Sequence, residues 1–179
     1  MTTTTQLRRS LAGLTVLVER DLEPVWQQVT TPAQARAALG DVLPVLVDTY
    51  GSAAGALAAD WYDDARDAAE IPGRFQAIPA EAPDDASSLI RWASREAVSL
   101  ETMPTLVLGG VQRRVVNTAR GTVMGSSIAD PKARGWKRVG SGRCDFCRML
   151  IGRGAVYTEA TVNFHAHDHC GCGAAPAWA

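Results

Sequence analysis

The sequence predicts an α+β protein, with a mainly helical N-terminal body over residues 1–130 and a small β-rich knuckle module over residues 131–179. Three observations lead to this prediction. Apolar residues before position 130 recur with helical spacing, the segment after Asp130 is glycine-rich and basic, and all four cysteines and all three histidines lie within residues 144–172. A body large enough to bury a core is thus followed by a module too small to do so.

The first helix is predicted from apolar residues that recur at spacings of three and four and form one stripe: Leu7, Leu11, Leu14, Val18 and Leu22. Pro24 lacks a backbone N–H and disfavours helical geometry in the residue before it. We therefore expect this helix to end or kink at Pro24, with Val25, Trp26 and Val29 in a short continuation. A second start is predicted at Thr31 and Pro32, because threonine caps helices and proline fits the first helical position.

The longest helical run is predicted over residues 41–70, with Asp41 as its cap and Pro44 in its first turn, where proline is tolerated. One face of this run gathers eight residues: Leu43, Val47, Tyr50, Ala54, Leu57, Trp61, Ala65 and Ala68. Alanines and two glycines around residues 52–59 leave little side chain, so a neighbouring helix can approach closely there. We interpret Asp60, Trp61 and Tyr62 as residues that pack and also carry a hydrogen-bonding group, rather than as catalytic groups.

Residues 71–86 carry three prolines with small and acidic residues and predict a surface connection. A helix is expected to resume near Asp84 or Asp85, with five residues facing inward: Leu89, Trp92, Ala93, Ala97 and Leu100. Pro104 should stop this helix, and residues 106–128 predict another one, weakened by its glycines. In the module, short strands are predicted over residues 136–139, 154–160 and 162–167 from their aromatic and β-branched content.

The global composition is that of an ordinary globular protein, with 46% hydrophobic residues, 21% charged residues and a formal net charge of -1. The near-neutral balance gives no overall reason to expect binding to nucleic acid or membranes. No stretch approaches the roughly 20 apolar residues of a membrane span. The first eleven residues lack the apolar core and cleavage site of a signal peptide. We therefore expect synthesis in a reducing cytoplasm and no membrane partner.

The cysteines and histidines follow the pattern C-x2-C, a gap, and H-x2-C-x-C, formed by Cys144, Cys147, His167, Cys170 and Cys172. A C-x2-C turn places two sulfurs on one side of a knuckle, and a second group across the gap completes a tetrahedral zinc site. The pattern therefore predicts a structural Zn²⁺ that stabilises the small module. The exact set of four ligands stays open. Cys144 and Cys147 are the strongest candidates and His167 and Cys172 come next, whereas Cys170 and His169 compete with them and His165 is the weakest.

Two interpretations without metal compete with the zinc site. Four buried thiols beside three solvated histidines would need no ion, and a disulfide would need an oxidising compartment that we do not expect.

A catalytic zinc site is a further alternative to the structural one. It would need a nearby acid or base, and the local candidates are Asp145, Glu159 and Asp168. Motifs typical of zinc proteases, serine hydrolases and P-loop enzymes are absent from the sequence. We therefore expect no catalytic residues and no enzymatic activity.

Zinc knuckles often bind nucleic acids, and basic residues surround this one: Lys137, Arg138, Arg143, Arg148 and Arg153. A DNA-binding module is therefore the alternative hypothesis. The opposing interpretation is that these side chains form an ordinary solvated face.

The segments WKRVGSGRCDFCRMLIGRGAVY and FHAHDHCGCGAAPAW together resemble the C-terminal part of MuF-like minor capsid or head morphogenesis proteins of tailed bacteriophages, above all those of actinobacteria. In that family a C-x2-C pair precedes an H-x2-C-x-C group and a proline. The matching residues are Cys144, Cys147, His167, Cys170, Cys172 and Pro176. The helical segment YGSAAGALAADWYDDAR is similar to the body that precedes this motif, so the resemblance covers much of residues 45–179.

The resemblance implies a structural protein of the virion, made in the host cytoplasm and located inside the head near the portal. Its expected partners are the portal and major capsid proteins, and any contact with DNA is expected to be weak. Some relatives are labelled capsid maturation proteases or are fused to one. This chain is short and shows no protease motif, so we expect an assembly function. A DNA-binding zinc module for the packaged or ejected genome is the first alternative, and a capsid maturation protease is the second.

Overall fold

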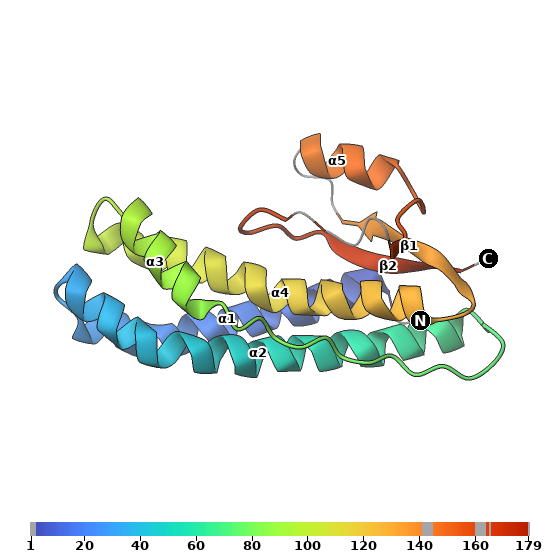
Figure 1. Ribbon diagram of the computed structural model, residues 1–179, viewed down its shortest axis with the longest axis horizontal. Helices are drawn as coiled ribbons and strands as arrows, with labels where there is room; N and C mark the ends of the chain where they lie inside the picture. The colour runs from blue at the N-terminus through green and yellow to red at the C-terminus, as the bar shows by residue number, and fades with distance from the viewer. Residues whose placement is uncertain (1–2, 141–144, 160–163, 165, 179) are drawn as a thin grey trace.

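The computed structural model describes residues 3–140, 145–159, 164 and 166–178 (Figure 1). Three long helices, α1 (Thr4–Gln28), α2 (Pro32–Ala68) and α4 (Met103–Ala129), lie side by side, and the shorter α3 (Ala86–Glu96) packs against α2 and α4. Strands β1 (Ala133–Val139) and β2 (Gly173–Trp178) form a two-stranded antiparallel sheet that packs on α4. The predicted class is confirmed: a mostly helical body carries a small sheet at its C-terminal end.

Helix α1 begins after Thr3, whose side chain accepts a hydrogen bond from the backbone N–H of Gln6. The predicted apolar stripe faces the core, and Val18 and Leu22 are almost fully buried. The expected end at Pro24 is wrong, because the helix continues through it to Gln28. Burial of residues on both sides of Pro24 outweighs the loss of one backbone hydrogen bond.

Helix α2 starts where Thr31 and Pro32 predicted it, with a reciprocal capping box between Thr31 and Gln34. A separate helix capped by Asp41 was wrong, because α2 is one helix of 37 residues and Pro44 lies in its interior. Leu39 and Leu43 are both fully buried, so the same apolar stripe continues across the expected break. Packing of this stripe against the bundle keeps the helix continuous.

By length and composition alone, α2 is apolar enough to cross a membrane, with a hydropathy of 1.4 over its most apolar window. Core helices of soluble proteins meet the same criterion. In this structure 44% of that window is buried, and α2 packs against α1, α3 and α4. Its apolar residues therefore build the core of the bundle.

The small residues of α2 do allow close approach, as expected. A Cβ atom added to Gly51 would lie 2.7 Å from the Cβ of Ala82 and 3.4 Å from Oγ1 of Thr118 on α4. One turn later, a Cβ on Gly55 would lie 3.0 Å from the carbonyl oxygen of Ala80. The predicted surface connection runs along α2 (Figure 1), and its Ala80 N–H donates to Thr122 Oγ1 on α4 at 2.9 Å. The connection therefore packs on α2 and α4 instead of extending into solvent.

The second half of the body departs from prediction at Pro104. Helix α3 already ends at Glu96, and a short 3-10 turn, η1 (Leu100–Thr102), follows. Pro104 lies in the first turn of α4, so it starts a helix rather than stopping one. The helix expected over residues 106–128 is confirmed and spans Met103–Ala129.

The module contains one predicted strand and two unpredicted elements. Residues 136–139 lie in β1 as expected, whereas residues 154–160 contribute only an isolated bridge between Tyr157 and Trp136. Phe164 and residues 166–167, the described part of the third predicted strand, are not in a strand. Instead, β1 pairs with β2, and the short helix α5 (Asp145–Gly152) lies between them in the chain. Pro176 pairs with Trp136 and is tolerated because each strand of a two-stranded sheet has a free edge.

Asp130, at the end of α4, joins the body to the module. Its carboxylate is buried and accepts hydrogen bonds from Arg66 Nε at 3.0 Å, Tyr62 Oη at 3.2 Å, Trp178 Nε1 at 3.1 Å and the Lys132 N–H at 2.9 Å. These donors come from α2, from β2 and from the turn before β1. The regions 1–130 and 131–179 also share one cluster of buried residues. The boundary at residue 130 stays a prediction.

Candidate metal centre

Three predicted ligands meet between α5 and the segment that leads into β2. Cys147 lies on α5, and His167 and Cys170 lie in the loop before β2. One ligand atom from each lies within 4.8 Å of the other two, so the group could bind a metal ion. The Cys147 and Cys170 sulfurs are 3.9 Å apart. Two thiolates on one tetrahedral zinc ion, with Zn–S distances of about 2.3 Å, would lie about 3.8 Å apart.

Cys172 completes a set of three neighbouring thiols. All three described cysteines are buried, and no disulfide joins them. The Cys172 thiol hydrogen-bonds to Cys170, and this contact lowers the pKa of Cys170 while it raises the pKa of Cys172. One thiolate thus shares the proton of its neighbour. Such a cluster would release its remaining protons to solvent when a soft metal ion binds the thiolates.

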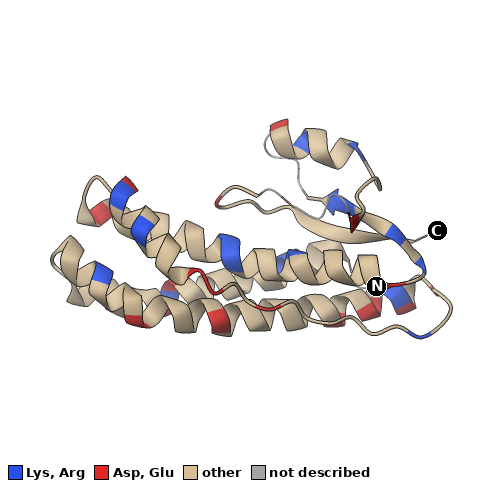
Figure 2. Ribbon diagram, in the orientation of Figure 1, with Lys and Arg blue, Asp and Glu red and all other residues tan. Residues whose placement is uncertain are grey.

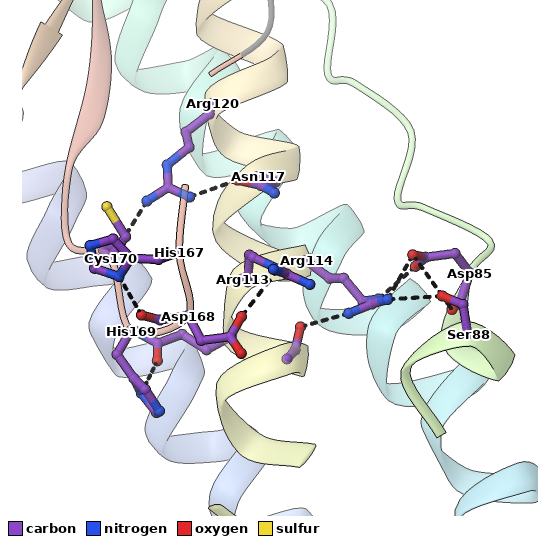
Figure 3. Close-up of polar contacts among 12 residues, drawn as sticks. Asp85, Ser88, Arg113, Arg114, Asn117, Arg120, His167, Asp168, His169 and Cys170 are labelled. Carbon is purple, nitrogen blue, oxygen red and sulfur yellow. Dashed lines mark hydrogen bonds and ion pairs between the residues drawn. The ribbon is translucent and has the colours of Figure 1, made fainter. Parts of the chain in front are cut away.

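The other candidate ligands have different positions. Cys144 and His165 lie outside the described residues. His169 is directed toward α4, where its Nδ1 lies 2.9 Å from Oε1 of Gln112 (Figure 3). Its backbone has a φ of 58°, in the left-handed region. The structure therefore groups His167, and not His169, with the cysteines.

The acidic residues considered for catalysis do not gather at the thiols. Asp168 forms an ion pair with Arg113 of α4, with 3.2 Å between Oδ1 and Nε (Figure 3). Asp145 is exposed and pairs with Arg148 on the same turn of α5. Glu159 is also exposed. Among the described residues, the cluster therefore consists of thiols and one imidazole.

Arg120 of α4 holds the loop that carries Cys170 and Cys172, and sequence reasoning missed it. Its side chain is buried, with 2% of the residue surface exposed. Nη2 donates to the carbonyl of Cys170 at 2.6 Å (Figure 3). Nε donates to the carbonyl of Cys172 at 2.9 Å. Burial lowers the pKa of Arg120 to about 10, and the neighbouring Cys170 opposes that shift. The sequence signal that could have indicated Arg120 was an arginine among small and apolar residues on the buried face of α4.

A stack of aromatic rings lies beside Arg120 and Arg138. Trp136 stacks on Tyr157 with 4.5 Å between ring centroids and on Phe164 with 5.8 Å. The guanidinium carbons of Arg138 and Arg120 lie 3.8 Å and 4.6 Å from the Phe164 centroid. Arg138 is 3% exposed, so it is not on the basic surface that the DNA-binding hypothesis assumed. Buried guanidinium groups instead stabilise this part of the core through cation–π contacts.

Fold and site together define a mainly helical protein whose C-terminal region carries a cluster of buried cysteines and the exposed His167, able to bind a metal ion. The profile of the VG15 protein family matches residues 1–179, and the chain therefore belongs to this family of phage proteins. No curated protein and no solved structure shows significant similarity to the chain.

Proposed function

We propose that this phage protein is a MuF-like minor capsid protein that acts with the portal and major capsid proteins in head assembly. The observation that carries the proposal is the terminal arrangement of Cys147, His167, Cys170 and Cys172 before Pro176, in a chain that belongs to a phage protein family. Its proposed location is the interior of the head near the portal.

We infer that the metal is zinc and that its role is structural. Thiolate and imidazole are the ligands that structural zinc sites use, and the sulfur separation fits tetrahedral coordination. The thiols are buried, Cys147 lies on α5, and the carbonyls of Cys170 and Cys172 accept hydrogen bonds from Arg120 of α4. When bound, zinc would supply a crosslink between α5 and the loop before β2. Cys147 and Cys170 would hold it, with His167 and Cys172 as the nearest further ligands.

An assembly function without hydrolytic activity agrees with this arrangement. Asp168, the acidic residue closest in sequence to the ligand group, is engaged by Arg113 rather than directed at the thiols. A hydrolytic zinc site needs an acid or base that faces the open metal position. The proposed role therefore depends on surfaces for protein partners.

Partner contacts are expected on exposed apolar side chains of both regions. Trp26, Phe75 and Trp178 are half-buried and pack against the core, which makes them poor anchors. The most exposed large apolar residues are Val16, Val45, Ile78, Val98, Met149 and Val156. Partner proteins that cover such residues would gain apolar burial.

The proposal is tested with phage particles made with and without the gene. We expect the protein in purified wild-type heads by mass spectrometry, and we expect fewer or defective heads without it. Incubation of the purified protein with unprocessed capsid protein should leave that substrate intact. Absence from wild-type particles would refute the assembly role, and metal-dependent cleavage of the capsid protein would replace it with a protease.

The DNA-binding alternative has less support. Figure 2 shows acidic and basic residues spread over the helical body, and of the basic residues named for the module, Arg138 is buried and Arg148 pairs with Asp145. Lys137 and Arg153 remain exposed, and Arg143 lies outside the described residues. We therefore expect weak, salt-sensitive binding to duplex DNA. Sub-micromolar binding at physiological salt would favour this alternative over the assembly role.

A further inference from the structure

Arginines of the helical body bind three consecutive carbonyl groups of residues 170–172, which we call the ligand loop. Arg8 of α1 donates from Nε to the carbonyl of Gly171 at 2.7 Å. Arg120 of α4 donates to the carbonyls of Cys170 and Cys172, at 2.6 Å from Nη2 and 2.9 Å from Nε respectively. Each carbonyl of the Cys170–Gly171–Cys172 segment is thus fixed by a side chain from a helix.

The geometry of Arg120 depends on the planar fork of its guanidinium group. Nε and Nη2 reach two carbonyls two residues apart, and Nη1 donates to Oδ1 of Asn117 at 2.6 Å. Asn117 lies one turn earlier on α4 and holds the group in place. A guanidinium group presents several donors in one plane, so it fixes the backbone on both sides of Gly171 at once.

The charge of Arg120 also requires a partner. Burying a cation is costly unless an anion lies nearby. Within the described part of the chain, the hydrogen bonds of Arg120 go to two backbone carbonyls and an amide, and none goes to a carboxylate. The side chains of Cys170, Cys172 and Cys147 interact electrostatically with Arg120, and they would carry negative charge as metal-bound thiolates. A divalent ion held by three or more thiolates carries net negative charge and would supply the missing counter-charge.

We propose that Arg120, assisted by Arg8, is a positioning residue of the metal centre. It fixes the backbone of Cys170 and Cys172 and balances the negative charge of their metal-bound thiolates. Metal binding is therefore coupled to docking of the ligand loop on the helical body. The proposal rests on the metal site proposed above. It assigns part of the metal affinity to side chains of α1 and α4. Arg8 lies 163 residues before Gly171, and Arg120 lies 50 residues before Cys170. Partners of this kind around a metal typically contribute about 10- to 100-fold in affinity.

The test uses the full chain with cobalt(II) as a spectroscopic substitute for zinc. Wild type, Arg120→Met, Arg120→Lys and Arg8→Met are compared by chelator competition and by the cobalt–thiolate absorption bands. Arg148→Met is the matched control, because it removes a positive charge beside Cys147 from a side chain that is 68% exposed. Far-UV circular dichroism of each variant reports whether the helices are intact.

We expect Arg120→Met to weaken cobalt binding by about 10- to 100-fold and to shift the absorption bands. Arg120→Lys should recover part of the affinity, because it keeps the charge and loses the fork. Arg8→Met should have a smaller effect, and Arg148→Met should match wild type.

Two results would overturn the proposal. The first is wild-type affinity and wild-type spectra in Arg120→Met, or in both Arg120→Lys and Arg8→Met if Arg120→Met does not fold. The second is Arg120→Lys no better than a folded Arg120→Met, which would refute the role of charge. If wild type itself binds neither cobalt nor zinc, the metal site fails, and this failure is distinct from one confined to the variants.

Discussion

Asp130 illustrates how a single buried side chain can join separate parts of this molecule. Its carboxylate receives donors from Tyr62, Arg66 and Trp178, and Arg66 in turn donates to the carbonyls of Pro72 and Gly73. A buried ion pair with its polar groups hydrogen-bonded is tolerated, whereas a broken one leaves an uncompensated charge. The end of α4, the C-terminal part of α2 and strand β2 therefore depend on one carboxylate.

Replacing this carboxylate should reduce stability strongly. Asp130→Asn leaves the Arg66 charge buried without its counter-ion, and we expect the free energy of unfolding to fall by about 3 kcal/mol. Urea denaturation followed by circular dichroism measures the change. The control is Asp67→Asn, an exposed aspartate near Arg66 in the same helix, which should change stability by less than about 0.5 kcal/mol. Equal stability of Asp130→Asn and wild type would contradict the role of the buried pair.

The same carboxylate should make stability depend on pH in the acidic range. Burial would raise the pKa of Asp130, but the Lys132 N–H and Arg66 outweigh it and hold the pKa below its ordinary value of 3.8. A lowered pKa means that the unfolded chain takes up the proton more readily. The contribution of Asp130 to the free energy of unfolding is therefore present above about pH 4, and it is lost as the pH falls through the pKa of the folded state.

Denaturation of wild type and Asp130→Asn at several pH values measures this dependence. The difference in unfolding free energy between them should be constant from pH 7 to about pH 5 and should shrink below about pH 4. A difference that stays constant down to pH 3 would show that Asp130 does not titrate as inferred.

At the scale of elements, local sequence signals predicted helix existence better than helix boundaries. Thr31 with Pro32 marked a real start because the capping box is a local interaction. Pro24 and Pro44 suggested boundaries that do not exist, because tertiary burial of the flanking stripe decided the outcome. Strand β2 was missed because its glycine, alanines and proline have low strand propensity, and its pairing with β1 is long-range.

The candidate site was predictable only in its local part. The spacing of Cys147, Cys170 and Cys172 indicated a shared centre, since short spacings bring ligands together in many folds. Arg120 and Arg8 could not be found this way, because Arg120 lies 50 residues from Cys170 and Arg8 lies 163 residues from Gly171. Only the packing of α1, α4 and the loop brings them together.

Two glycines of α2 allow a matched test of helix packing. At Gly51 an added Cβ would lie 2.7 Å from Ala82, whereas at Gly40 it would meet nothing within 4 Å. We expect Gly40→Ala to raise stability by about 0.5–1 kcal/mol through helix propensity. Gly51→Ala should instead lower it by about 1 kcal/mol, since overpacking outweighs that gain. Thermal denaturation measures the stability of both variants. A stabilised Gly51→Ala would show that the connection around Ala82 can move aside without loss of stability.

For the molecule as a whole, the body and the module share one core, and the thiol cluster lies at their junction. Below about 70 residues, a single hydrophobic core rarely supplies enough stability, so a module of this size usually needs a metal, disulfides or a partner to fold. Here the partner is α4, on which the sheet packs, and the proposed metal adds a second constraint. Loss of the metal should therefore loosen residues 131–179 more than the helices.

Protein purified without a metal-affinity tag should contain about one equivalent of zinc per chain by elemental analysis. Cys147→Ser should lose most of this metal and become sensitive to trypsin within residues 131–179, while α1 to α4 stay protected. Met149→Ser is the control, because this side chain lies on the same helix and is half exposed. A fully folded, protease-resistant module without metal would contradict the structural role.

The positions of Arg8 and Arg120 along the chain also set an order of events during synthesis. Ribosomes produce α1 and α4 before residues 170–172, so Arg8 and Arg120 emerge well ahead of the carbonyl groups that they bind. Contacts between residues far apart in sequence form late, because a long loop must close first. Until then, the guanidinium group of Arg120 can remain hydrated, which keeps that face of α4 open. We therefore expect the completed ligand loop to close the helical body as the last step of folding, at the moment when the metal can first be captured.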